Sequence, residues 1–68
     1  MKTMTIADAT SRVEAIRVCR FDFEAAHGME DELRADVLRE VVRKNPRSVR
    51  LAEIALSTDD IEFQRCGA

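Results

Sequence analysis

The regular spacing of apolar residues between positions 22 and 44 limits what this chain can fold into more than any other feature. Apolar side chains recur there at intervals of three and four residues, at Phe23, Ala26, Met29, Leu33, Val37 and Val41. An α-helix has about 3.6 residues per turn, so these side chains share one face over about six turns. Leu38 and Val42 broaden that face near its end. The pattern predicts an amphipathic helix that must bury one face.

The ends and the middle of this helix carry signals of their own. Asp22 is a good N-cap, and the helix is predicted to run to Lys44. Gly28 interrupts the pattern and costs about 1 kcal/mol relative to Ala inside a helix. Two interpretations therefore stay open: one continuous helix, or a short turn over 22–27 followed by a main helix over 29–44.

A first helix is predicted over residues 5–20. Thr5 and Asp8 stand three positions apart, which is the arrangement of a capping box. A narrow apolar stripe follows, formed by Ile6, Ala9, Val13 and Ile16 and widened by Val18 and Cys19. We expect this stripe to pack in the core of its own chain, although its width also suits a helix of a second copy in a homodimer.

The dipeptide Asn45-Pro46 predicts a break before a third helix over residues 46–57. The residue before a proline disfavours the α conformation, and Pro fits the first position of a helix that Asn45 caps. This third helix has one main apolar row, which consists of Val49, Ala52 and Leu56, with Leu51 and Ala55 beside it.

The segment after the third helix is predicted to form a short turn and a tail. Ser57 can cap the turn, with Asp60 three positions on. Ile61 and Phe63 are two apart, so they suit an extended tail that folds back onto the core. The chain, residues 1–68, is therefore predicted to be one all-α domain, a small three-helix bundle with a short C-terminal tail packed on it.

Composition bounds the function. The net charge of −2 provides no bulk attraction to nucleic acid or to an anionic membrane. No apolar run approaches the ~18 residues that span a bilayer, and the N-terminus has no signal-peptide core, so we expect a cytoplasmic protein. Cys19 and Cys66 are too few for a disulfide scaffold, and we interpret them as free thiols. A chain this short buries only ~60% of its unfolded surface, so a partner or a second copy would stabilise it.

No residue pattern points to catalysis. The chain has one His and two Gly, and it contains neither a phosphate-binding loop nor a nucleophile motif. His27 stands three and four positions before Glu30 and Asp31, so on a helix the three side chains share a face that suits a divalent metal. A structural zinc site needs four ligands, and we favour a hydrogen bond from His27 to a carboxylate or a helix cap. We therefore expect a binding protein with no cofactor, no metal and no enzymatic activity.

Charge is unevenly distributed along the chain. Residues 22–36 carry six acids and one base, whereas residues 39–50 carry five bases and one acid. This order suits the dipole of a helix and also offers a charged surface to a partner. The segment 48–56 resembles the first helix of a helix-turn-helix motif, but three acids in 57–63 would repel phosphate. A DNA-binding regulator that uses the basic segment 39–50 is therefore the alternative hypothesis, with nucleic acid the less favoured partner.

Two parts of the chain resemble small proteins encoded by tailed phages and prophages. The run DFEAAHGMEDEL at 22–33 is similar to the D-P-E-A-A-H-S-x-E-D-x-L segment of those proteins. The runs LAEIAL at 51–56 and IEFQR at 61–65 resemble their L-A-x-x-A-L and I-D-F-x-R-W ending. The resemblance covers residues 20–68, and it assigns no established biochemical activity.

The resemblance implies an accessory protein of a mobile genetic element. Two residues depart from the pattern, because Phe23 replaces its Pro and Cys66 replaces its Trp. Very small proteins of this origin often act as stoichiometric inhibitors of host machinery, including anti-CRISPR and other anti-defence proteins. Our hypothesis is a protein-binding module that inhibits a host defence protein or complex through one charged face of the second helix. That face is either an acidic surface around Glu30, Asp31 and Glu32 or a basic surface around Arg39, Arg43 and Lys44. The residues expected to contact this partner are Glu30, Asp31, Glu32, Asp36, Arg39, Arg43 and Lys44.

Overall fold

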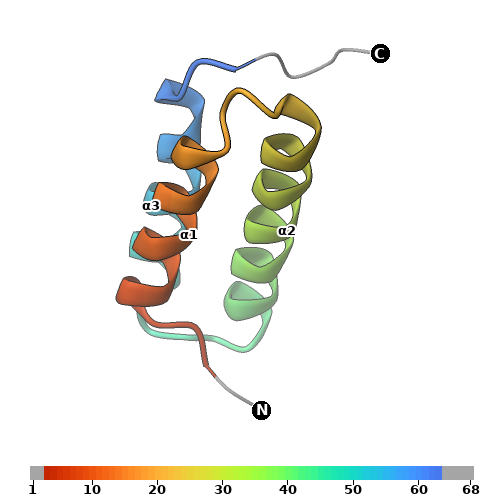
Figure 1. Ribbon diagram of the computed structural model, residues 1–68. Helices are drawn as coiled ribbons and strands as arrows, with labels where there is room; N and C mark the ends of the chain where they lie inside the picture. The colour runs from red at the N-terminus through yellow and green to blue at the C-terminus, as the bar shows by residue number, and fades with distance from the viewer. Residues whose placement is uncertain (1–2, 64–68) are drawn as a thin grey trace.

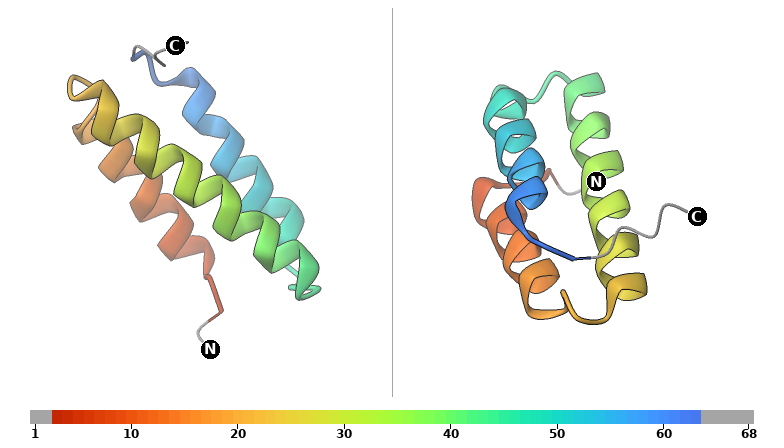
Figure 2. Two further views of the ribbon diagram at one scale, coloured as in Figure 1. Left: turned by 90° about the vertical axis from the view of Figure 1, so that its right-hand side faces the viewer. Right: turned by 90° about the horizontal axis from the view of Figure 1, so that it is seen from above.

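The computed structural model describes residues 3–63, which form three α-helices and one short 3₁₀ helix. The elements are α1 (Ile6–Val18), α2 (Phe23–Val42), α3 (Ser48–Leu56) and the 3₁₀ helix η1 (Ser57–Asp60). α1 and α3 run in the same direction, α2 runs opposite to both, and each helix packs against the other two (Figures 1 and 2). The predicted all-α three-helix bundle is confirmed, and residues 3–63 contain no strand.

The start of α1 agrees with the prediction and its end does not. Thr5 is the N-cap, and the capping box with Asp8 is present, with both hydrogen bonds at 3.0 Å. The helix ends at Val18, whose side chain is 72% exposed, so it does not widen the stripe. Val18 follows Ile16 by two residues, which is about 200° around a helix. The stripe itself packs in the core of its own chain through Ala9, Val13 and Ile16.

α2 is one continuous helix, so the interpretation with a separate turn before Gly28 is wrong. Asp22 caps it as predicted, because its carboxylate accepts a hydrogen bond from the backbone amide of Ala25. A methyl group at Gly28 would meet nothing within 4 Å, so no neighbour requires a glycine there. The helix ends at Val42, two residues earlier than predicted, and Lys44 then adopts a left-handed conformation with φ 61°.

The buried face of α2 shares Ala26, Leu33 and Val37 with the predicted row, so this part of the prediction is confirmed. The other two buried residues are Glu30 and Glu40, which complete a row of alternating steps of four and three. The predicted row takes three successive steps of four after Met29, and these carry its last residue, Val41, about 120° around the helix from Met29. Val41 therefore lies at the edge, while Leu38 and Val42 point to solvent. Phe23, at the other end of the predicted row, is also exposed.

Asn45 does not cap a helix that begins at Pro46. α3 begins at Ser48 with Arg47 as its N-cap, and no side chain caps it. Asn45 shapes the turn instead, since its side-chain oxygen accepts from the amide of Arg47 at 2.8 Å and its backbone oxygen accepts from that of Ser48 at 3.0 Å. The turn is therefore an Asx-type turn that directs the chain into α3.

α3 buries a different row from the predicted one. Leu51, Ile54 and Ala55 are buried, whereas Val49 and Leu56 are exposed. The predictions for Leu51 and Ala55 are confirmed, and the main row through Val49 and Leu56 is wrong. The sequence of α3 carries two apolar rows, and only contact with the other helices selects between them.

The end of the chain folds back as predicted. The short turn is η1, but Ser57 does not cap it, because its hydroxyl donates to the carbonyl of Ile54. Ile61 is buried and Phe63 packs half-buried against the core. Cys19 is a half-buried free thiol, and Cys66 lies outside the described residues.

Leu33 and Leu38 provide a matched test of the buried face of α2, because both are leucines in the middle of one helix. Leu33 is fully buried, and Leu38 is 65% exposed. We expect Leu33→Ala to lower the free energy of unfolding by about 2–5 kcal/mol, through lost packing and the cavity it leaves. Leu38→Ala should change it by less than about 0.5 kcal/mol. Urea unfolding measures both values, and equal losses would contradict this assignment.

Candidate interaction surface on α2

The exposed surface of α2 has a charged side and an apolar side. Four charged residues at steps of four, three and four form a line that we call the charged stripe: Glu32, Asp36, Arg39 and Arg43. This stripe lies next to α1, because Nη1 of Arg12 in α1 donates to Oδ2 of Asp36 at 2.9 Å. The apolar side of α2 lies toward α3.

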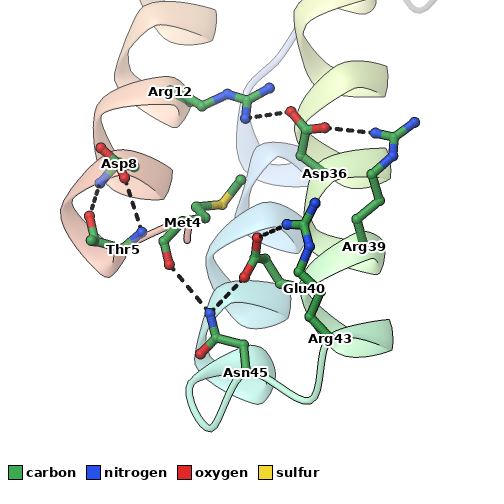
Figure 3. Close-up of polar contacts among 9 residues, drawn as sticks. All are labelled: Met4, Thr5, Asp8, Arg12, Asp36, Arg39, Glu40, Arg43 and Asn45. Carbon is green, nitrogen blue, oxygen red and sulfur yellow. Dashed lines mark hydrogen bonds and ion pairs between the residues drawn. The ribbon is translucent and has the colours of Figure 1, made fainter. Parts of the chain in front are cut away.

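A groove of about 470 Å³ lies between the charged stripe and the start of α1. Its walls include Asp8, Ser11 and Arg12 from α1, and Asp36, Arg39 and Arg43 from α2. Figure 3 shows Arg12 of α1 and Asp36 of α2 pointing toward one another. The surface therefore combines a concave shape with fixed charges of both signs.

Asp36 joins two arginines at the upper end of the groove. Its Oδ1 accepts from Nη1 of Arg39 at 2.7 Å, and its other oxygen accepts from Arg12 (Figure 3). The hydrogen bond from Arg12 is the main cause that lowers the pKa of Asp36 below its ordinary value. The Arg39 side chain is 62% exposed, and exposed ion pairs contribute only about 0–1 kcal/mol. Arg39 can therefore exchange Asp36 for a carboxylate of a partner at small cost.

Glu40 holds the lower end of the groove together. Its side chain is 3% exposed, and it accepts hydrogen bonds from Nδ2 of Asn45 at 2.8 Å and from Nη1 of Arg43 at 2.6 Å. The same amide nitrogen of Asn45 also lies 3.4 Å from the carbonyl oxygen of Met4 (Figure 3). The hydrogen bond from Asn45, with smaller effects of Met4 and Arg43, lowers the pKa of Glu40. This network ties the N-terminal segment, α2 and the α2–α3 turn to one another.

The predicted contact residues fall in several places. Glu32, Asp36, Arg39 and Arg43 come together on the charged stripe. Glu30 is buried between the helices, with its carboxylate 3.6 Å from Arg34, so its place in an acidic surface is wrong. Glu30 lies on the buried row of steps of four and three, and the helix cannot expose it without exposing Leu33 too. Asp31 lies on the other side of α2, and Lys44 lies in the turn.

His27 lies near a single carboxylate, and the predicted hydrogen bond to a carboxylate stays a prediction. Its Nε2 lies 3.5 Å from Oδ2 of Asp31, one turn later in α2. Glu30 turns into the core, so the three side chains do not converge. Among residues 3–63, no group of three His, Cys, Asp or Glu side chains is placed to hold a metal ion.

Two features of this surface were not predicted from the sequence: the burial of Glu40 and the ion pair of Arg12 with Asp36. The burial of Glu40 had a local signal, since it falls on the alternating row that includes Leu33 and Val37. The pair of Arg12 with Asp36 joins residues 24 positions apart and had no local signal.

Comparisons with protein-family models, curated proteins and solved structures find no match to this chain. No helix within residues 3–63 is long and apolar enough to cross a membrane. The geometry of α1 and α2 is therefore the main basis for assigning a function.

The lowered pKa values of Asp36 and Glu40 predict acid sensitivity. Both carboxyls bind protons less tightly when folded than at their ordinary values of 3.8 and 4.5, so their contribution to stability is complete above those values and is lost as the pH falls below them. We expect the urea midpoint to fall between about pH 5 and about pH 3, and to fall less steeply in Glu40→Gln, which keeps the shape but cannot titrate. Parallel slopes would contradict this role of Glu40.

Proposed function

We propose that this chain is a non-catalytic protein-binding module that docks on its partner through the charged stripe of α2. The observation that carries the proposal is the exposed guanidinium of Arg39, held beside a groove by the shared carboxylate of Asp36. Arginine in this position presents a planar fork of donors that matches a carboxylate of a partner.

The part of the bundle beneath the stripe supports this function. It is held in place by buried polar contacts, whereas the ion pairs of the stripe can be exchanged for contacts with a partner. Glu40 and Asn45 fix the end of α2 against the N-terminal segment. The side chains of Arg39 and Glu32 are exposed on the surface of the bundle. They can therefore form new ion pairs with a partner without any change in the core. A preorganised surface loses less entropy on binding than a flexible one. The two signs of charge along the stripe favour one orientation of the partner.

The partner that we propose is a host defence protein or complex, which the chain inhibits stoichiometrically in the cytoplasm. The resemblance of residues 22–33 to small phage and prophage proteins supports this part of the proposal. That segment forms the first half of α2 and ends beside the charged stripe. An inhibitor of this kind acts by covering a functional surface of its target, so it needs a stable face and no catalytic group.

The alternative, a DNA-binding regulator, has less support from the geometry. Among the bases of segment 39–50, Arg43 is held by the buried carboxylate of Glu40 at 2.6 Å, so it is committed to the bundle. The segment after α3 forms the single 3₁₀ turn η1, where a helix-turn-helix protein needs a recognition helix. Gel-shift assays over a range of salt concentrations test this alternative, and no shift near physiological salt would remove it.

Arg39 and Arg50 provide a matched test of the proposed function. Their side chains are 62% and 64% exposed, and each pairs with an acid three residues away. We expect Arg39→Glu to abolish capture of the partner from a host lysate, since it reverses the charge beside the groove. Arg50→Glu should leave capture unchanged, because Arg50 lies on α3 away from the stripe. The wild-type chain and the two variants are compared side by side in one pull-down experiment.

Two measurements make the outcome decisive. Urea unfolding must give similar midpoints for both variants, as expected for exposed ion pairs. The captured protein, once purified, should lose its activity when the wild-type chain is added at an equal molar ratio, and the Arg39→Glu variant should not inhibit it. Equal capture by all three chains would refute the charged stripe as the docking surface.

A further inference from the structure

The outer surface of α2 and α3 carries an apolar face that the bundle leaves uncovered. Its large side chains are between 47% and 80% exposed: Leu38, Val41 and Val42 on α2, and Val49 and Leu56 on α3. The half-buried Ala52 lies between the last two. We call this set the α2–α3 face. Soluble monomers rarely expose a contiguous apolar area unless another surface covers it in function.

An ion pair shows that these side chains form one continuous surface. Arg34 of α2 and Asp59 of η1 lie 2.7 Å apart. Steps of four residues along α2 lead from Arg34 to Leu38 and Val42. Steps of three, four and three back along the chain lead from Asp59 to Leu56, Ala52 and Val49, and such steps keep side chains on one side of a helix. Since α2 and α3 are antiparallel neighbours (Figure 2), both rows run side by side from the ion pair toward the α2–α3 turn.

We propose that a second copy of this chain covers the α2–α3 face, in an antiparallel homodimer with a two-fold axis perpendicular to the helices. The inference uses different residues from the charged stripe, whose Asp36 pairs with Arg12 on the side of α2 next to α1. Each dimer therefore leaves two charged stripes open to partners.

Charge complementarity selects a second copy and sets its orientation. Asp31 and Asp59 stand exposed at one end of the face, and Lys44 stands exposed at the other end. A perpendicular two-fold axis places the acidic end of each copy against the basic end of the other, so every favourable contact occurs twice. A parallel arrangement would bring like charges together.

The area of the face is suited to an interface of modest size. Five aliphatic side chains at these exposures supply the apolar centre of the contact in each copy. A standard interface buries about 800 Å² on each partner, of which somewhat more than half is apolar. The charged ends of the α2–α3 face supply the polar rim.

Sedimentation equilibrium of the full chain tests the proposal, at concentrations from about 1 μM to about 500 μM. We expect the wild-type chain to sediment with twice its 7.7 kDa mass in the upper part of this range. Val42→Glu should weaken the association at least tenfold, because it places a charge within the apolar contact. Val18→Glu is the matched control, since Val18 is similarly exposed but lies at the end of α1, and it should not change the association.

A charge swap tests the orientation. Lys44→Glu should weaken the dimer, and adding Asp31→Lys to it should restore the association, because the two residues meet across the two-fold axis. If Val42→Glu fails to fold by circular dichroism, Leu38→Gln replaces it as the variant of the apolar contact. A wild-type chain that stays monomeric over the whole range would overturn the proposal, as would an unchanged association in the variant of the apolar contact. Assemblies larger than two copies would refute the two-fold arrangement. If a different protein covers this face, the chain will stay monomeric, and Val42→Glu will abolish its capture of that protein from a host lysate.

Discussion

The buried carboxylate of Glu40 is the interaction on which the lower half of the bundle depends. A carboxylate inside a small core is costly unless its oxygens are paired, and Asn45 and Arg43 supply that pairing. Asn45 can satisfy Glu40 only if the α2–α3 turn lies directly below α2, and its contact with Met4 requires the N-terminal segment to lie there too. One polar network therefore sets the entry of α3, the end of α2 and the floor of the groove beside the charged stripe.

This arrangement divides α2 into surfaces with different properties. The side next to α1 carries ionic groups that are already paired but remain exchangeable, because solvent screens them. The side next to α3 carries aliphatic groups with no counterpart in the bundle. A helix of 20 residues in a three-helix bundle has more surface than two neighbours can cover, so part of it must face solvent or another chain. The charged stripe and the α2–α3 face are the two consequences, and they provide separate surfaces for separate partners.

Features that depend on nearby residues were predictable from the sequence. The capping box of Thr5, the cap of Asp22 and the break near Asn45 depend on groups within a few residues of one another. The folding back of Ile61 was also predictable, because a large aliphatic residue after the last helix has no other place to be buried. The charged stripe of the candidate site was also predictable, because it is a line of charged residues on one helix. The groove beside the stripe was not predictable, since Arg12 and Asp36 meet only after two helices dock.

The sequence by itself determined that the chain forms three helices and that it must bury an apolar core. It also determined which residues cap two of these helices. Only the tertiary structure decided which row of α3 is inside and which acids of α2 are buried. An exposed and a buried row on α3 have similar hydrophobicity, and the choice between Val49 and Leu51 depends on how α3 is rotated against its neighbours. For the same reason Glu30 is in the core and Glu32 is at the surface. Local propensity acts along the chain, whereas the rotation of a helix is set by packing and polar pairing between segments that are distant in sequence.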